Sequence, residues 1–78
     1  SKKNEFKILG PYLKSGDIIM AHDYAPDREY FEENMRDKIW NWFEIQDSDI
    51  KVVSDINHLE PFWQDHFINV AWCCRRKI

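Results

Sequence analysis

The feature that most constrains this chain is a short apolar segment, Ile18–Ala21, which lies between turn-forming residues. Gly16 and Asp17 precede it, and the polar tripeptide His22-Asp23-Tyr24 follows it. A continuous apolar run without alternating polar residues is typical of a strand that is covered on both faces, as in a parallel sheet. We therefore expect a central strand over residues 17–22, around which the rest of the chain packs.

Helical patterns precede and follow this segment. Before it, Phe6, Leu9 and Leu13 recur at helical spacing. We expect this helix to break at Gly10-Pro11, because proline has no N–H and disfavours helical backbone at the preceding residue. After the strand, Asp27 can cap the first turn of a second helix. One apolar stripe marks that helix: Phe31, Met35, Ile39 and Trp42.

The second half of the chain predicts one more helix and a second strand. Asp47-Ser48-Asp49 is a strong helix start, and we expect the helix to end before Pro61. Residues 64–66 are expected to form a loop, followed by a strand over residues 67–75 that lies antiparallel to the central strand or nearby. The expected order is helix, strand, helix, short strand, helix and strand, in one small α/β domain over residues 1–78.

Composition and charge argue against two large classes of partner. The net charge is −3 with both signs interspersed, so the basic patch of a nucleic-acid-binding protein is missing. No apolar run approaches the ~20 residues of a membrane helix, and the N-terminus lacks the apolar core of a signal peptide. We expect a cytoplasmic protein with Cys73 and Cys74 reduced and buried in a strand. The cationic cluster Arg75-Arg76-Lys77 is expected to be a solvated tail.

The candidate chemistry lies at the end of the apolar segment. In open α/β sheets, ligands bind beyond the carboxyl ends of the strands, where this sequence places a base, a carboxylate and a phenol. His22, Asp23 and Tyr24 are therefore the candidate catalytic residues, and Asp23 is also a candidate ligand for a divalent cation. The structural alternative is that Asp23 caps the following turn and that His22 only holds a hydrogen bond.

Two other kinds of site are not expected. A zinc site needs about four converging ligands, and His58 and His66 have no partners at ligand spacing. The chain has only two glycines, Gly10 and Gly16. That excludes a Gly-rich phosphate or dinucleotide loop of the usual kind.

Aromatic residues are unusually frequent for a chain of this size. Four Trp and five Phe in 78 residues indicate either a dense core or a surface that contacts another chain. Trp40 lies off the apolar stripe of its predicted helix. Because tryptophan is favoured at protein interfaces, Trp40 and Trp63 are the residues that we expect to contact a partner.

The segment Tyr12-Leu13-Lys14-Ser15-Gly16-Asp17, the apolar strand and His22-Asp23-Tyr24 together resemble the later half of class I S-adenosylmethionine-dependent methyltransferases. In that fold a helix and a similar turn precede the fifth strand, which often ends in His-Asp or Asp-Asn. A helix follows, and a final antiparallel strand closes the sheet. Residues 40–50 and the closing run 69–77 are also similar to methyltransferase-like proteins.

This resemblance implies a partial Rossmann-like topology in which His22, Asp23 and Tyr24 line the substrate side. In the metal-dependent branch of the family, the aspartate that matches Asp23 binds a divalent cation, and the next residue is Asn, where this chain has Tyr24. The family's Gly-rich cofactor loop, its ribose-binding acid and its other metal carboxylate belong to the first half, which is absent here. The resemblance therefore implies no cofactor for the isolated chain, and S-adenosylmethionine only together with a complementary N-terminal half.

Two functions follow from these expectations. The first is a methyltransferase-like C-terminal fragment, or a piece of a split enzyme, that is not catalytic on its own. The second is a small non-enzymatic α/β interaction module that homodimerises through a sheet edge and exposed aromatic residues, because half of a doubly wound sheet leaves one edge open. The expected partner is a second copy in one case and a complementary chain in the other.

Overall fold

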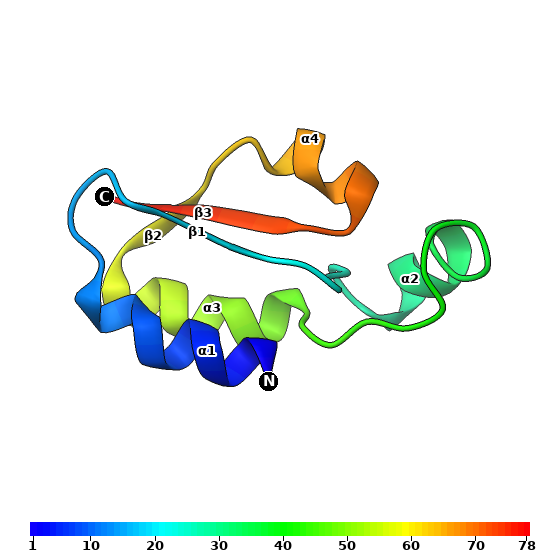
Figure 1. The fold of residues 1–78 in the computed structure, drawn as a ribbon, viewed down its shortest axis with the longest axis horizontal. Coiled ribbons are helices and arrows are strands. Elements are labelled where there is room, and N and C mark those ends of the chain that lie inside the picture. Colours follow the sequence, from blue (N-terminus) through cyan, green and yellow to red (C-terminus); the bar gives the residue numbers. More distant parts are fainter.

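A three-stranded antiparallel sheet forms the centre of the computed structural model, which describes residues 1–78 (Figure 1). β1 (Ile18–Ala21) and β2 (Leu59–Pro61) both pair antiparallel with β3 (Cys73–Lys77), which lies between them. β1 and β2 therefore run parallel to each other and are separated by one strand. The small α/β class and the antiparallel closing strand agree with the sequence analysis. The expected order of the elements is wrong in one place, because the short strand lies after the helix Asp47–Asn57 and not before it, where Ile45 forms only an isolated bridge with Tyr24.

The helices are distributed unequally over the sheet. α1 (Lys2–Leu9) and α3 (Asp47–Asn57) lie side by side on one face (Figure 1). On the other face only the short α4 (Gln64–Phe67) packs near β3, and it continues into the 3₁₀ turn η2 (Ile68–Val70). α2 (Arg28–Asn34) lies beyond the end of the sheet (Figure 1). None of these helices has the length and apolarity to cross a membrane.

Local sequence signals explain where the helices begin and end. α1 gives way to the 3₁₀ turn η1 (Gly10–Tyr12) at the predicted Gly10-Pro11 break. Asp27 caps α2 as predicted, because its carboxylate accepts a hydrogen bond from the Tyr30 N–H at 2.8 Å. α3 begins at the predicted Asp47, behind a reciprocal capping box between Gln46 and Asp49.

The main core fills the space between the sheet and the α1–α3 pair. Its fully or largely buried members come from both helices, all three strands and the segments after β1 and before α3: Phe6, Ile19, Ala21, Tyr24, Ile45, Ile50, Val53, Leu59 and Cys73. A smaller cluster surrounds α2: Ala25, Phe31, Met35 and Ala71. The opposite face of the sheet contributes no member to the main core, so the fold is built on one side of its sheet.

The expectation that the first strand is central and covered on both faces is wrong. β1 is an edge strand, and its side chains alternate between exposed and buried. Ile19 and Ala21 face the core, whereas Ile18 is 49% exposed and Met20 is 38% exposed. The apolar run predicted helices packed on both faces of this strand. The short α4 is the one helix on the second face, and it leaves β1 uncovered there.

The predicted helix from Asp27 through Trp42 is too long. α2 ends at Asn34, because the Met35 carbonyl accepts hydrogen bonds from several following N–H groups and Asp37 adopts a left-handed backbone with φ of 60°. Ile39 is 45% exposed and Trp42 is 56% exposed, so the last two positions of the expected stripe do not reach the core.

The C-terminal prediction is shifted along the chain. The expected loop at residues 64–66 is helix α4, and the expected strand over residues 67–75 begins only at Cys73. Left-handed backbone at Ala71 (φ 60°) closes η2 and redirects the chain into β3. Arg75-Arg76-Lys77 is consequently part of the central strand and not a solvated tail. Cys73 and Cys74 are confirmed as buried strand residues with free thiols.

The close approach of α1 to α3 at Gly10 yields a first prediction. A Cβ on Gly10 would lie 2.8 Å from Asn57 Nδ2 and 2.9 Å from Val53 Cγ1. Gly10→Ala should therefore lower the free energy of unfolding by about 1–3 kcal/mol, the usual cost of overpacking, although Gly10 has ordinary helical dihedrals. Urea unfolding measures the change. Ile8→Ala, at a position that is 65% exposed, is the control, and equal stability of the two variants would contradict this packing.

Candidate functional site

The structure brings His22 and Asp23 together at the carboxyl end of β1. His22 Nδ1 lies 2.9 Å from Asp23 Oδ2, and the His22 ring packs edge-on against Trp72 with 5.3 Å between ring centroids. The His22 side chain is about half exposed. Asp23 has left-handed backbone, and its carbonyl accepts the N–H groups of Glu44 and Ile45. Asp23 thus contacts His22 through its side chain and shapes a turn through its backbone.

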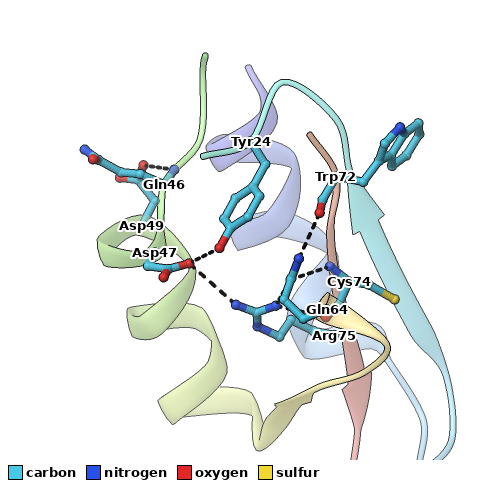
Figure 2. Close-up of polar contacts among 8 residues, drawn as sticks. All are labelled: Tyr24, Gln46, Asp47, Asp49, Gln64, Trp72, Cys74 and Arg75. Atoms are coloured by element: carbon cyan, nitrogen blue, oxygen red, sulfur yellow. Dashed lines mark hydrogen bonds and ion pairs between the residues drawn. The ribbon is translucent and has the colours of Figure 1, made fainter. Parts of the chain in front are cut away.

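Tyr24 points away from that pair and into the core. It is only 2% exposed, and its hydroxyl donates a hydrogen bond to Asp47 Oδ1 at the start of α3 (Figure 2). The three consecutive candidates thus divide into a surface pair and a buried phenol. A substrate that contacts His22 and Asp23 would not reach the Tyr24 hydroxyl by the same route.

No group of three or more His, Cys, Asp and Glu side chains is arranged to hold a metal ion. Asp23 has one polar neighbour of this kind, His22. His58 is the left-handed residue that ends α3, and His66 lies in α4. A metal role for Asp23 stays a prediction from the sequence, and any further ligands would have to come from another molecule.

A polar network that the sequence analysis did not identify lies beneath β3 (Figure 2). Arg75 Nη2 lies 3.7 Å from Asp47 Oδ1, and Arg75 Nη1 donates to Gln64 Oε1 and, at 2.9 Å, to the Cys74 carbonyl. Gln64 Nε2 donates to the Trp72 carbonyl at 2.9 Å, and Gln64 Oε1 accepts the Cys74 N–H at 3.0 Å. The Gln64 amide thus bonds to β3 as the peptide group of a neighbouring strand would.

Arg75 is the charged residue that the fold buries, with 8% of its surface exposed. It was missed because the sequence places it in an apparent tail of three cations. The signal that could have found it is alternation, because Cys73 and Arg75 share the face of β3 that carries the core. Its partners, Asp47 and Gln64, were read only as a helix start and a loop residue.

Burial changes the acid–base properties of the groups around this network. Burial, reinforced by the hydrogen bond to Asp47, raises the pKa of Tyr24 far above its usual value, and Arg75 opposes the shift only in part. Burial also raises the pKa of the Cys73 thiol to about 11 and raises that of Cys74. At neutral pH all three groups are protonated, so none is a ready nucleophile or base.

An apolar surface occupies the face of the sheet opposite α1 and α3. Six side chains line a cavity of about 230 Å³ there: Ile18, Met20, Phe62, Trp63, Phe67 and Cys74. Trp63 is 66% exposed and belongs to this surface. Trp40 is 38% exposed and lies in the turn after α2, on a separate part of the molecule.

The chain was compared with protein-family models, with curated proteins and with solved structures, and it matches none of them. The functional conclusions below therefore depend on the geometry of this chain.

The bond between Tyr24 and Asp47 yields a second prediction. Tyr24→Phe removes one hydrogen bond to a charged acceptor, which should lower the free energy of unfolding by about 1.5–3 kcal/mol. Tyr12→Phe, at a position that is 80% exposed, is the matched control and should change it little. Urea unfolding at neutral pH compares the two variants.

The same pair of variants tests the raised pKa. Because the folded-state pKa of Tyr24 lies above its ordinary value of 10.0, Tyr24 stabilises the fold fully below that pH and progressively less above it. The stability difference between wild type and Tyr24→Phe should shrink as the pH rises above 10.0. Cys73 affects both proteins equally between pH 9.0 and about 11. A difference that stays constant with pH would contradict the buried phenol.

Proposed function

We propose that this chain is a non-enzymatic interaction module that pairs with a second copy of itself along the open edge of β1. The observation that carries the proposal is the combination of an unpaired strand edge and an exposed apolar face at the same residues, Ile18 and Met20. Unpaired edges are templates for another strand, and natural monomers protect them.

The backbone of β1 supports this proposal. Lys77 N–H donates to the Asp17 carbonyl at 2.8 Å, which makes Asp17–Lys77 a hydrogen-bonded pair next to β1. In an antiparallel ladder the hydrogen-bonded positions alternate, so Ile19 and Ala21 bond to β3. The N–H and C=O groups of Ile18 and Met20 consequently face away from β3, where no strand lies.

The two edges of the sheet differ in how they are protected. β2 spans three residues, ends in Pro61, which has no N–H to donate, and carries the charged Glu60 in an ion pair with Arg76. Short length, proline and charge are the devices that discourage pairing at an edge. β1 has no proline and no charged residue. Pairing is therefore favoured at β1 and disfavoured at β2.

The sequence of β1 is self-complementary in an antiparallel pair. With a two-fold axis at Ile19, Ile18 of one copy lies opposite Met20 of the other, and both are outward hydrogen-bonding positions. Apolar side chains then meet apolar side chains on both faces of the joined sheet. Trp63 stands beside Ile18 and Met20 on the exposed face, so it is the aromatic residue that we expect nearest to the interface.

A charge on the edge should abolish this pairing. Met20 is already 38% exposed in the single chain, so Met20→Lys should leave the monomer folded while it places a desolvated ammonium in the pair. Val52→Lys also replaces an exposed apolar side chain by lysine, on α3 at a position that is 60% exposed, and this variant should still dimerise. Sedimentation equilibrium measures the association constant. A wild-type chain that stays monomeric up to millimolar concentration would overturn the proposal.

A second candidate function is a methyltransferase-like half that is completed by another chain. The order of the elements supports it: α1, a turn, β1 with His22 and Asp23 at its carboxyl end, helices, and the antiparallel β3. The strands β1 and β2 are parallel, α3 lies between them in the chain, and β3 lies between them in the sheet. Such a split β-α-β unit is what we expect for part of a larger α/β sheet. In this function the complementary half would occupy the β1 edge and supply the S-adenosylmethionine site.

Calorimetric titration with S-adenosylmethionine tests whether the isolated chain binds the cofactor by itself, which neither candidate function predicts. The isolated chain has no Gly-rich loop, so we expect no heat of binding at any pH near neutrality. Met20→Lys, which should not affect cofactor binding, is the control for changes in association. Saturable micromolar binding by the wild-type chain would contradict both candidates, because it would require a cofactor site within these 78 residues.

A further inference from the structure

A surface groove lies between the two helices that cover the sheet, α1 and α3, which run side by side (Figure 1). Its volume is about 430 Å³. Each helix contributes one row of side chains at i, i+4 spacing, and each row covers about two turns, or about 12 Å of helix. The two rows are Lys3, Lys7 and Pro11 on one side, and Ser48, Val52 and Ile56 on the other.

The α3 side of this groove is apolar. Val52 is 60% exposed and Ile56 is 70% exposed, while Val53 lines the groove beside them and is only 6% exposed. A surface helix ordinarily carries polar side chains on the part that lies outside the core. Side chains one turn apart form the ridges through which helices pack on each other. Val52 and Ile56 therefore form a ridge on which a further helix can pack.

The α1 side of the groove is cationic. Lys3 and Lys7 lie one turn apart, and neither takes part in an ion pair of this structure. Residues 1–14 contain four of the eleven Lys and Arg side chains but only one of the fourteen Asp and Glu side chains. Asp49 also lines the groove, but its carboxylate accepts the Gln46 N–H at 3.1 Å and is held at the start of α3. Positive charge is thus concentrated along one side of the groove in a chain whose net charge is −3.

We propose that the α1–α3 groove binds an amphipathic, acidic helix of a partner protein. An apolar stripe of that helix packs on Val52 and Ile56, and a flanking row of Asp or Glu side chains pairs with Lys3 and Lys7. Binding of an amphipathic helix in a groove through anchors at i, i+3, i+4 and i+7 is a recurrent mode of recognition. The groove shares no residue with the apolar surface at Ile18 and Met20, so this partner and a second copy of the chain use different sites.

Amide NMR titration of the full chain with a synthetic peptide tests the proposal. The probe is a helix of about 21 residues built from the repeat Glu-Leu-Ala-Gln-Glu-Leu-Ala, because isolated helices shorter than ~12–15 residues are marginal. We expect saturable shifts at residues 3–11 and 48–57, with a dissociation constant below about 1 mM. A peptide with Gln at every Glu position should bind about threefold to tenfold more weakly, the value of two exposed ion pairs, and one with Lys more weakly still. Absence of saturable shifts, equal binding of the Glu and Lys peptides, or shifts confined to Ile18, Met20 and Trp63 would overturn the proposal.

Matched lysine variants isolate the contribution of charge. The double variant Lys3→Gln, Lys7→Gln should bind the Glu and Gln peptides equally. Lys14→Gln, the same change at an exposed position outside the groove, should keep the preference for the Glu peptide. A double variant that retains this preference would also overturn the proposal.

Two variants separate this site from the β1 edge. Val52→Lys places a charge on the apolar side of the groove, so it should abolish binding of the Glu peptide and leave self-association unchanged. Met20→Lys should bind the peptide with the affinity of the wild-type chain, whatever its effect on self-association. Loss of peptide binding in Met20→Lys, or full binding in Val52→Lys, would contradict the placement of the site.

Discussion

The rest of this structure depends on the burial of one guanidinium in the central strand. A buried charge costs several kcal/mol unless partners surround it. Arg75 finds these partners in Asp47 at the start of α3, in Gln64 at the start of α4 and in the carbonyl of its own neighbour, Cys74. Since Asp47 also accepts the Tyr24 hydroxyl, one charge connects both helix starts to the segment after β1 (Figure 2). Arg75 thereby links α3 on one face of the sheet to α4 on the other.

A one-sided sheet is the consequence of the chain's small size. α1 and α3 supply enough apolar surface to cover one face, and the four residues of α4 cover only part of the other. A chain of this length buries a limited fraction of its surface and gains stability from further burial. Pairing along β1 would provide that burial where the fold itself does not. The exposed Ile18 and Met20 are thus explained by the absence of a second helical layer.

The sequence predicted those features that are decided by local chemistry. The Gly10-Pro11 break, the Asp27 cap and the Asp47 start all depend on the backbone bonds of a few neighbouring residues, and all three are confirmed. Predictions from hydrophobic periodicity were wrong where contacts between distant parts of the chain determine the structure. The run Ile18–Ala21 has the composition of a doubly covered strand, but composition does not state whether a second layer exists. The stripe after Phe31 likewise continues in the sequence beyond the point where α2 unwinds.

The polar network could not be predicted, because its members are separated in the sequence and each has a simpler local explanation. Asp47 is a good helix start, Gln64 lies in a polar stretch, and Arg75 stands among cations. These three side chains meet because of the register of β3 with β2, in which Pro61 lies opposite Arg75. They also meet because β2 ends at Pro61, so that the chain leaves the sheet there. That register is set by packing across the whole sheet and not by any short motif.

The two polar clusters of this fold differ in exposure and in their partners. His22 and Asp23 contact each other at 2.9 Å at the end of β1, where the His22 side chain is about half exposed. Arg75 is buried, and Asp47, Gln64 and the Cys74 carbonyl surround its guanidinium. Burial makes an unpaired charge expensive, so the loss of one of these partners would cost more than the loss of the His22–Asp23 contact. The Arg75 cluster is therefore explained by the fold itself, whereas the exposed pair lies where the strand-end rule places ligands in α/β sheets.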